Sequence, residues 1–398
     1  MPPYPWDDLA PLTEKASAFP GGAIDLSLGS PTDPVPSVVQ EALAAAADAP
    51  GYPTTAGTPE LREAAAGWLA RTLDVHVPPT AVLPVAGTKE LIAWLPTQLG
   101  LGPGDTVIYP ELAYPTYEVG ARLAGATPMA SDGLDDGTGG GASSEGASSE
   151  GASSGGIGNS GGAGGPARLH WINSPSNPTG RVLPTDRLRE AVARARDRGC
   201  VLASDECYIS LGWEATPTSA LHPAVRGDSL DGVLAVFSLS KRSNLAGYRA
   251  GFIAGDPELI ASLLLIRKQS GMIVPKPVQA AMTAALNDDA HADEQKERYR
   301  ARREILRDGL EEAGFRIEHS EAGLYLWASR PGTDGRTATE LLAAECGILV
   351  GPGYMYGPSG APYIRVALTA SDERVAAAAG RLRALAAPLL RMKVPLLR

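Results

Sequence analysis

The sequence predicts an α/β protein in which a large domain with a mostly parallel sheet of the seven-stranded type is joined to a smaller α+β domain. Three observations lead to this class. Short apolar runs alternate with helical patterns through most of the chain, as they do in βαβ units. This alternation stops after Pro277. The chain has 398 residues, of which 44% are hydrophobic, enough for two domains with a substantial core.

Six apolar runs are predicted to form buried strands of the large sheet. They are AVLPVAG from residue 81, DTVIYPE from 105, ARLHWINSP from 167, CVLASDECY from 200, GVLAVFSLS from 232 and AGFIAGD from 250. Helical patterns lie between several of these runs, over 88–99, 115–124, 184–198 and 256–269. Ligands of such sheets bind beyond the carboxyl ends of the strands, and most of these runs end in polar or turn residues.

The segment after Pro277 is predicted to form most of the smaller domain. Helices are expected over 277–287, 292–314 and 337–347 and from Asp372 onward, with strands within 315–329 and 362–369. We therefore expect a large domain over 46–285 and a smaller one over 286–398. Residues 1–45 are expected to form an N-terminal arm and part of the smaller domain, because the run IDLSLGSP is too isolated to build its own core.

A stretch rich in glycine and serine interrupts the large domain over 133–165 and contains GASSEGASSEGASSGG. Such a composition cannot bury enough apolar surface to offset the entropy lost on ordering. We predict a flexible surface insertion between the runs GATPMAS and ARLHWINSP.

The bulk composition argues against several function classes. The net charge is −10 and no basic block stands out, which disfavours nucleic acid or an anionic membrane as the main partner. No apolar run approaches the roughly 18 residues of a membrane span. The N-terminal MPPYPWDDLAPL lacks the basic and apolar regions of a signal peptide, so a cytoplasmic protein is expected. Three cysteines suggest no disulfide framework, and five histidines show no metal-ligand spacing, so no metal is expected.

The segment SLSKRSNLAGYRAG, residues 238–251, follows a predicted strand and carries one of only seven lysines. Lys241 is expected where this strand gives way to a loop. An amine at the mouth of a sheet can form a Schiff base with an aldehyde cofactor. Ser238, Ser240 and Arg249 on the same segment suit a phosphate group. A solvated surface lysine is the alternative, but this neighbourhood favours an attachment point for pyridoxal phosphate.

Other strand ends could supply further parts of such a site. Gly87, Thr88 and Lys89 lie where a strand turns into a helix, and a helix N-terminus favours a phosphate. Asp205 ends an apolar run and could keep the pyridine nitrogen protonated, so that the ring draws electrons. A helix cap is the alternative role for Asp205.

Four more residues complete the set of candidates. Tyr208 and Asn177 could hydrogen-bond the phenolic oxygen of the ring, although the segment NSPSNPTG around Asn177 also suits a plain turn. Tyr114 could stack on the ring face or simply pack in the core. Arg365 lies among apolar residues in YIRVAL, which is costly unless the arginine meets an anion such as a substrate carboxylate.

With these residues, the chain resembles the fold-type I, class I and II pyridoxal-phosphate aminotransferases. The chain resembles that family from LSLGSP to YIRVALT, apart from the Gly- and Ser-rich stretch, and NSPSNPTG, SDECY and SLSKRSNLAGYRAG are its strongest motifs. The resemblance implies a fold-type I transferase with pyridoxal 5′-phosphate as cofactor. Its substrates would be amino acids and 2-oxo acids, such as glutamate and 2-oxoglutarate.

The resemblance also implies a role for each residue that meets the cofactor ring. Lys241 would carry the cofactor and shuttle the proton. Asp205 would pair with the pyridine nitrogen, and Tyr208 and Asn177 would touch the phenolic oxygen. Tyr114 would stack on the ring.

The resemblance further implies how phosphate and substrate are held. The phosphate site would consist of strand-end and helix-start residues, namely Gly87, Thr88, Lys89, Ser238, Ser240 and Arg249. Tyr52, in GYPTTAGTPELR, matches a tyrosine that reaches the phosphate from the neighbouring subunit, which implies a homodimer with shared active sites. Arg365 and Gly29 would contact the α-carboxylate of the substrate, and Asn177 would also line the substrate site. No residue that recognises the far end of the substrate is identified.

Residues 4–36 and 85–121 resemble the N-succinyldiaminopimelate aminotransferases of lysine and cell-wall biosynthesis. The expected reaction is therefore transfer between N-succinyl-LL-2,6-diaminopimelate and 2-oxoglutarate. An aminotransferase of the aspartate, aromatic or alanine type, or a C–S β-lyase, would use nearly the same residues. A regulator is disfavoured because the N-terminal segment is too short and too acidic for a DNA-binding domain. A nicotinamide dehydrogenase is disfavoured because no G-x-G-x-x-G follows the first strand.

Overall fold

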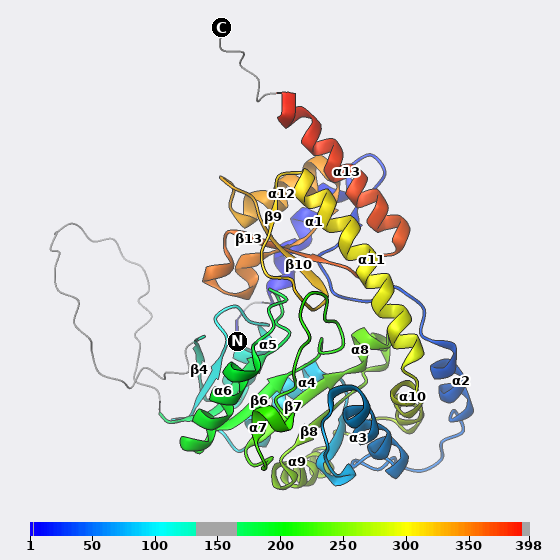
Figure 1. Cartoon of the computed structure of the whole chain (residues 1–398), viewed down its shortest axis with the longest axis vertical. Coiled ribbons are helices and arrows are strands. Elements are labelled where there is room, and N and C mark those ends of the chain that lie inside the picture. Colours follow the sequence, from blue (N-terminus) through cyan, green and yellow to red (C-terminus); the bar gives the residue numbers. More distant parts are fainter. Residues whose placement is uncertain (3, 133–164, 392–398) are drawn as a thin grey trace, which may run out of the picture.

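The computed structural model describes residues 1–2, 4–132 and 165–391. The predicted insertion over 133–165 lies, except for Gly165, outside the described residues. Figure 1 shows a large sheet surrounded by helices, with a smaller unit above it that is formed mainly by the C-terminal elements.

A seven-stranded sheet forms the centre of the larger unit, as the sequence predicts. Its strands lie in the order β2, β8, β7, β6, β5, β3, β4, and β8 runs antiparallel to both of its neighbours while the others are parallel to one another. The bounds are β2 Val82–Val85, β3 Thr106–Tyr109, β4 Thr127–Ala130, β5 Ala167–Asn173, β6 Val201–Asp205, β7 Val233–Ser238 and β8 Gly251–Gly255. All six predicted strands are present.

The residues of β7 show why these runs are apolar along their whole length. Ala235 and Phe237 belong to the core on one side of the sheet, and Leu234 and Val236 belong to the core on the other. Successive side chains of a strand point to opposite faces, and helices cover both faces here, so every position of β7 is buried.

The seventh strand, β4, is covered by none of the predicted apolar runs. It pairs with β3 and with no other described strand, so it forms an edge of the sheet. Its sequence is TPMA, whose residues are half-buried or exposed. An edge strand tolerates Pro128 because one side of its backbone forms no ladder.

Helices pack on both faces of the large sheet. The four helices predicted from the alternation are present as α4 Thr88–Gln98, α5 Thr116–Leu123, α6 Thr185–Asp197 and α9 Pro257–Ser270. Further helices of this unit are α2 Ser37–Ala45, α3 Pro59–Leu73, α7 Pro223–Arg226 and α10 Lys276–Asn287. Trp68 of α3 packs edge-on against Phe237 and Phe252, at centroid distances of 5.6 and 6.0 Å, and so anchors α3 to β7 and β8.

The smaller unit is built on an antiparallel sheet in the order β12, β13, β10, β9. These strands span Gly351–Pro352, Tyr363–Ala367, Tyr325–Ser329 and Arg316–Ile317. Three helices accompany them, α11 Ala290–Glu312, α12 Gly335–Cys346 and α13 Asp372–Arg391. In Figure 1 the long helix α11 extends from beside α10 up into this unit, where it packs along α13.

The N-terminal segment joins the smaller unit through strand pairing. β1 (Ile24–Asp25) pairs in parallel with β11 (Ile348–Leu349), and α1 (Ala10–Ser17) packs on α12. The chain after β1 then crosses to the larger unit, where α2 packs on α10. Short 3₁₀ turns complete the described chain, at η1 Pro5–Leu9, η2 Pro79–Ala81, η3 Ala246–Tyr248, η4 Gly353–Tyr356 and η5 Pro358–Gly360.

Within the described ranges, no helix combines the length and the apolar character that a membrane crossing requires.

Candidate active site

Lys241 lies at the carboxyl end of β7, where the sequence places it. The expected loop is a one-turn helix, α8 (Leu239–Arg242), and this corrects the sequence interpretation. Ser238 starts that turn, because its Oγ accepts a hydrogen bond of 3.2 Å from the backbone N–H of Ser240. The Lys241 Nζ reaches the N-terminal segment and donates to the carbonyl oxygen of Gly29.

The surroundings of Lys241 favour its neutral amine. Burial lowers the pKa of Lys241, and the positive charges of Arg365 and Arg249 lower it further, against the opposing influence of Tyr325 and Cys207. A lysine whose pKa is lowered holds a free electron pair at neutral pH more often than a surface lysine does. Such an amine can act as a nucleophile or as a base.

Asp205 ends β6 and is buried with both carboxylate oxygens paired. Tyr117 donates its hydroxyl to Oδ2 at 2.7 Å, and the backbone N–H of Cys207 donates to Oδ1 at 3.2 Å. Burial raises the pKa of Asp205, against the lowering by these hydrogen bonds. A positively charged ring nitrogen beside this acid would favour its ionised form.

The start of α4 forms a cradle with Arg249. Gly87 has φ = 80° and caps the helix without a side-chain hydrogen bond. A Cβ at Gly87 would come within 2.3 Å of the Arg249 Nη2, so glycine allows the guanidinium to pack against the backbone at the start of α4. An uncapped helix N-terminus facing an arginine suits a phosphate group. Ser238 and Ser240 are buried at the end of β7 and in α8, and Ser238 pairs with Gly251 of β8, two residues after Arg249.

Thr88 and Lys89 occupy the first turn of the same helix. The Thr88 Oγ1 accepts a hydrogen bond of 3.3 Å from the Cys207 thiol, which links α4 to the segment after β6. The Lys89 Nζ lies 5.3 Å from the ring centroid of Tyr4 and 5.8 Å from that of Tyr114. Lys89 is exposed, so its side chain points to the rim of the site.

Tyr114 lies between β3 and α5 and is half-buried. Burial raises the pKa of its hydroxyl, and the charges of Tyr325 and Asp205 add to that effect. Its ring packs edge-on against Tyr117, with centroids 6.3 Å apart. The structure therefore brings Tyr114 to the same cluster as Asp205.

Arg365 of β13 faces the cluster from the smaller unit and is only 2% exposed. Its Nη1 donates to the Asn177 Oδ1 at 2.8 Å, and its Nη2 donates to the Ser27 carbonyl oxygen at 2.7 Å. Its Nε is buried and has no hydrogen-bond partner among the described residues. A buried guanidinium held only by neutral groups has capacity to bind a carboxylate.

Tyr208 follows Asp205 by three residues and is buried against the same arginine. Its hydroxyl lies 3.2 Å from the hydroxyl of Tyr325. Burial raises the pKa of Tyr208 well above its usual value, so the hydroxyl keeps its proton. The structure thus collects Lys241, Asp205 and Tyr208 at adjacent strand ends, with Arg365 facing them.

Tyr52 is the one sequence candidate that stands apart from this cluster. It lies between α2 and α3 and is 99% exposed. Within the single chain no hydrogen bond or ring contact of Tyr52 joins it to the other described site residues.

Several residues of the cluster are absent from the sequence candidates. They are buried or half-buried and contact a candidate directly: Ser27, Tyr117, Cys207 and Tyr325. Tyr117 lies three residues after Tyr114, and Cys207 lies between Asp205 and Tyr208, so both belong to segments that already contain candidate residues. Tyr325 carried no such signal, because its contacts are made across the strand pairing of β10 with β13.

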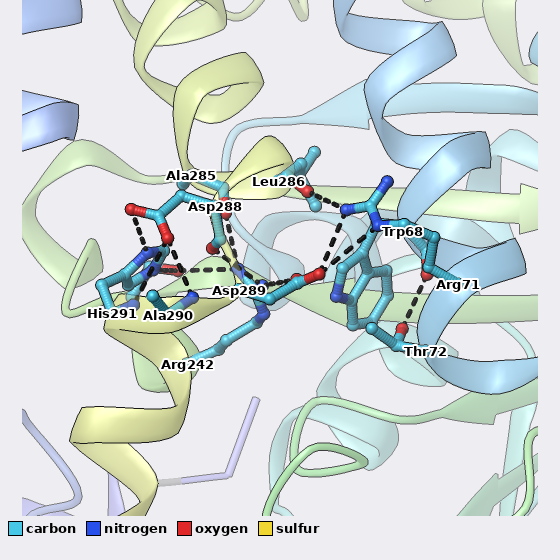
Figure 2. Close-up of polar contacts among 11 residues, drawn as sticks. Trp68, Arg71, Thr72, Arg242, Ala285, Leu286, Asp288, Asp289, Ala290 and His291 are labelled. Atoms are coloured by element: carbon cyan, nitrogen blue, oxygen red, sulfur yellow. Dashed lines mark hydrogen bonds and ion pairs between the residues drawn. The ribbon is translucent and has the colours of Figure 1, made fainter.

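Arg242, the residue after Lys241, was also missed. Figure 2 shows its guanidinium directed at the junction of α10 and α11. Its Nη1 donates to the Ala285 carbonyl oxygen at 2.7 Å, and its Nη2 lies 2.7 Å from the Asp289 Oδ1. The guanidinium carbon also lies 5.5 Å from the ring centroid of Trp68. These contacts fix α8, and with it the backbone of Lys241.

Comparison with known proteins gives a family match over most of the chain. A family model described as aminotransferase class I and II matches residues 22–382. The chain is 56% identical to the 4-dedimethylamino-4-oxo-anhydrotetracycline transaminase OxyQ of Streptomyces rimosus, over 96% of this chain and 99% of that protein. It is 55% identical to a probable aminotransferase of Mycobacterium tuberculosis, over 96% of this chain and 85% of that protein.

Diaminopimelate enzymes appear among more distant relatives. An LL-diaminopimelate aminotransferase of Aquifex aeolicus is 32% identical and covers 96% of each chain. Among solved structures, a probable N-succinyldiaminopimelate aminotransferase from Thermus thermophilus superimposes with a TM-score of 0.79 at 29% identity, over 96% of this chain and 100% of that one.

Proposed function

Because this chain belongs to the class I and II aminotransferase family, which depends on pyridoxal phosphate, we propose that it transfers an amino group between N-succinyl-LL-2,6-diaminopimelate and 2-oxoglutarate. The likeness to the Thermus thermophilus structure and to LL-diaminopimelate aminotransferases supports this substrate pair. One observation supports a substrate with an amino-acid carboxylate. Arg365 is buried without a carboxylate partner among the described residues, and its positive charge contributes to the lowered pKa of Lys241.

The described residues fit pyridoxal phosphate. Asp205 is a buried acid for the ring nitrogen, and the Arg249 guanidinium packs against Gly87 at a helix N-terminus that has no side-chain cap. When bound, the cofactor supplies an electron sink for the α-carbon of the substrate. Lys241 would take the proton from that carbon and deliver it to the cofactor instead of back to the α-carbon. Its lowered pKa suits this exchange.

The substrate would be held from the side of the smaller unit. Arg365 would bind its α-carboxylate, with Asn177 holding the guanidinium in place at 2.8 Å. Gly29 would line the same site, because its carbonyl oxygen accepts from Lys241 and no side chain occupies its position. Amino acids and 2-oxo acids share this carboxylate, so the same contacts serve both halves of the reaction.

A second candidate substrate follows from the strong likeness to OxyQ. At 56% identity over nearly the full length of both chains, this protein could aminate a polycyclic ketone of the kind named for that relative. Such a substrate would lack an α-carboxylate next to the reacting carbon, so Arg365 would have another partner. The two candidates therefore differ in how much activity depends on Arg365.

We further propose that the protein is a homodimer with shared active sites and that it acts in the cytoplasm on these water-soluble substrates. The proposal of a dimer rests on the family resemblance of the Tyr52 segment, and the 99% exposure of Tyr52 leaves its side chain free to contact a second subunit. Leu265 of α9 and Trp94 of α4 are also exposed, at 60% and 39%.

The test is a half-reaction followed by absorbance. Purified enzyme in its pyridoxal form receives L-glutamate or N-succinyl-LL-2,6-diaminopimelate, each alone. We expect both to convert the spectrum to that of the pyridoxamine form, and 2-oxoglutarate to restore it. The Lys241→Ala variant, loaded with cofactor, serves as the control and should show no conversion.

The other outcomes assign other functions. Conversion by glutamate alone would leave an aminotransferase with a different partner, and restoration of the pyridoxal form by the tetracycline ketone would favour the second candidate. Release of pyruvate and ammonia from cystathionine, with no conversion by either amino acid, would replace transfer by C–S bond cleavage.

A further inference from the structure

Tyr325 opens β10 and is buried among the groups described above. It belongs to the smaller unit, as Arg365 does, and the two strands that carry them are antiparallel neighbours. The register pairs Trp327 with Arg365 and Tyr325 with Ala367, so Tyr325 lies diagonally across from the arginine on the same sheet.

The ring of Tyr325 supports the Arg365 guanidinium. The guanidinium carbon lies 3.8 Å from the ring centroid, closer than any other arginine–ring approach among the described residues. The Asn177 and Ser27 oxygens hold Nη1 and Nη2 from the side. Together these contacts fix the plane of the guanidinium before any substrate arrives. A fixed plane matters because a carboxylate binds a guanidinium in its plane, through paired N–H groups.

The hydroxyl of Tyr325 lies against Gly29 of the N-terminal segment. A Cβ at Gly29 would come within 2.0 Å of this hydroxyl, so the Gly29 backbone packs directly against it. The Tyr208 hydroxyl lies 3.2 Å away, and Lys241 donates to the Gly29 carbonyl oxygen. The Tyr325 hydroxyl therefore lies beside residues that are expected to contact the substrate and the cofactor and to transfer the proton.

The direction of the Tyr208–Tyr325 hydrogen bond follows from their charged neighbours. Burial alone would raise the pKa of Tyr325, but Arg365 and Lys241, with the hydrogen bond from Tyr208, hold it below its ordinary value. The pKa of Tyr208 is raised instead. We assign Tyr208 as the donor and Tyr325 as the acceptor of this hydrogen bond, because the Arg365 guanidinium carbon lies only 3.8 Å from the Tyr325 ring centroid and favours negative charge on the Tyr325 oxygen. The titratable groups facing this pair from the surrounding elements are Arg365, Lys241, Cys207, Tyr114, Tyr299 and Tyr356.

We propose that Tyr325 is a positioning residue with two separable roles. Its ring orients Arg365 for the carboxylate of the substrate. Its hydroxyl accepts the single proton of Tyr208 and so weakens the hydrogen bond that Tyr208 can donate to the phenolic oxygen of the cofactor. The second role rests on the proposed function, because it requires Tyr208 to meet that oxygen.

Two substitutions separate the roles. Tyr325→Phe keeps the ring and removes the hydroxyl, and Tyr325→Leu removes both, with Tyr325→Met as the alternative if the leucine variant does not fold. Tyr363→Phe is the matched control. Tyr363 lies on the same strand as Arg365, and its hydroxyl donates outward to the Glu318 Oε2 at 2.8 Å.

The first readout is binding of glutarate, a dicarboxylate with no amino or oxo group, followed through its effect on the absorbance of the pyridoxal form. Loss of the ring should raise the Kd for glutarate about fivefold or more, as expected for a desolvated cation–π contact. Tyr325→Phe and Tyr363→Phe should stay within about twofold of the wild type. An unchanged Kd in Tyr325→Leu would overturn the first role.

The second readout is the pKa of the bound pyridoxal chromophore from an absorbance titration. In Tyr325→Phe the Tyr208 proton turns to the phenolic oxygen and stabilises its anionic form, so this pKa should fall by about half a unit or more. No shift, or a rise, would overturn the second role. If glutarate leaves the spectrum of the wild-type enzyme unchanged, this result would instead overturn the proposed carboxylate site at Arg365, and with it the role of the Tyr325 ring.

Discussion

At the residue scale, the adjacent buried acids Asp205 and Glu206 differ in how many of their carboxylate oxygens are hydrogen-bonded. Asp205 has both oxygens paired, whereas only one oxygen of its neighbour Glu206 is bonded, by the Ala220 N–H at 2.7 Å. The Glu206 Oε2 is buried and has no hydrogen-bond partner in the part of the chain that the structure describes. Burial raises the pKa of Glu206 from 4.5 to about 7. Asp205 is therefore suited to pair with a cation, whereas Glu206 holds its proton until the pH approaches about 7.

The neutral state of Glu206 predicts a pH dependence of stability. Between pH 4.5 and about 7 the folded protein holds a proton that the unfolded chain has released, so this contribution to stability is complete below pH 4.5 and is lost as the pH rises through 7. Glu206→Gln removes the titration. We expect its free energy of unfolding in urea to exceed that of the wild type at pH 8, by on the order of 1–3 kcal/mol, and the gap to close toward pH 5. A gap that is constant across this range would contradict the assignment.

Gly87 makes a second prediction at the residue scale. Gly87→Ala should weaken the binding of pyridoxal phosphate to apoenzyme by about tenfold or more, because the new methyl group would displace the Arg249 guanidinium from the cradle. Gly100→Ala is the control. Gly100 lies just beyond the other end of α4 with φ = 75° and nothing within 4 Å of its would-be Cβ, so it tests backbone strain alone. Equal losses of affinity in both variants would argue against the cradle.

At the element scale, an ion pair between the buried Arg242 and the half-buried Asp289 holds the short helix α8. Arg242 is 6% exposed and binds Asp289, whose other oxygen lies 3.4 Å from Arg71 on the surface (Figure 2). Burial lowers the pKa of Arg242, and Asp289 opposes this. The buried guanidinium therefore depends on Asp289 to offset its lost hydration, while Arg71 remains in solvent.

This asymmetry predicts unequal effects of two substitutions. Asp289→Asn should lower the free energy of unfolding by about 1–2 kcal/mol, because it leaves the Arg242 charge without its partner, although solvent near Asp289 reduces the loss. Arg71→Gln should change it by about 0.5 kcal/mol or less, as for most surface pairs. Urea denaturation of both variants checks the order, and a larger effect at Arg71 would reverse this account of the pair.

The elements also show what a sequence can and cannot predict. Buried strands and their polar ends were predictable because β5, β6 and β7 are mostly buried, largely apolar runs that end in polar residues. The edge strand β4 was not, because half of its pairing is missing and its residues are partly exposed. Lys241 and Arg365 stood out as costly charges in apolar settings. Tyr325 did not, since an aromatic residue in a strand is ordinary and only the β10–β13 register brings it to Arg365.

At the scale of the whole molecule, the site forms where the two units meet. Arg302 of α11 is 2% exposed and binds Asp33 through both Nη atoms, at 2.7 and 2.6 Å, and Asp372 through Nε at 2.6 Å. Asp33 follows Gly29 by four residues, so this cluster holds the segment whose carbonyl oxygen accepts from Lys241. The residues that face the proposed cofactor are thereby set by contacts that span both units.

The exposure of Tyr52 leads to the last prediction, which concerns the assembly. If Tyr52 completes the phosphate site of a second subunit, then Tyr52→Ala harms the partner's site while Lys241→Ala harms its own. A heterodimer of the two variants would hold one intact site and one doubly damaged site. Purified with two different affinity tags, it should recover about half of the wild-type activity per dimer, although each parent homodimer is nearly inactive. A heterodimer of Lys241→Ala with Asp205→Ala is the control, because both losses remain in their own subunits and no intact site can form. Recovery in the first pair and not in the second requires a site shared between subunits, whereas two inactive mixtures would place Tyr52 outside it.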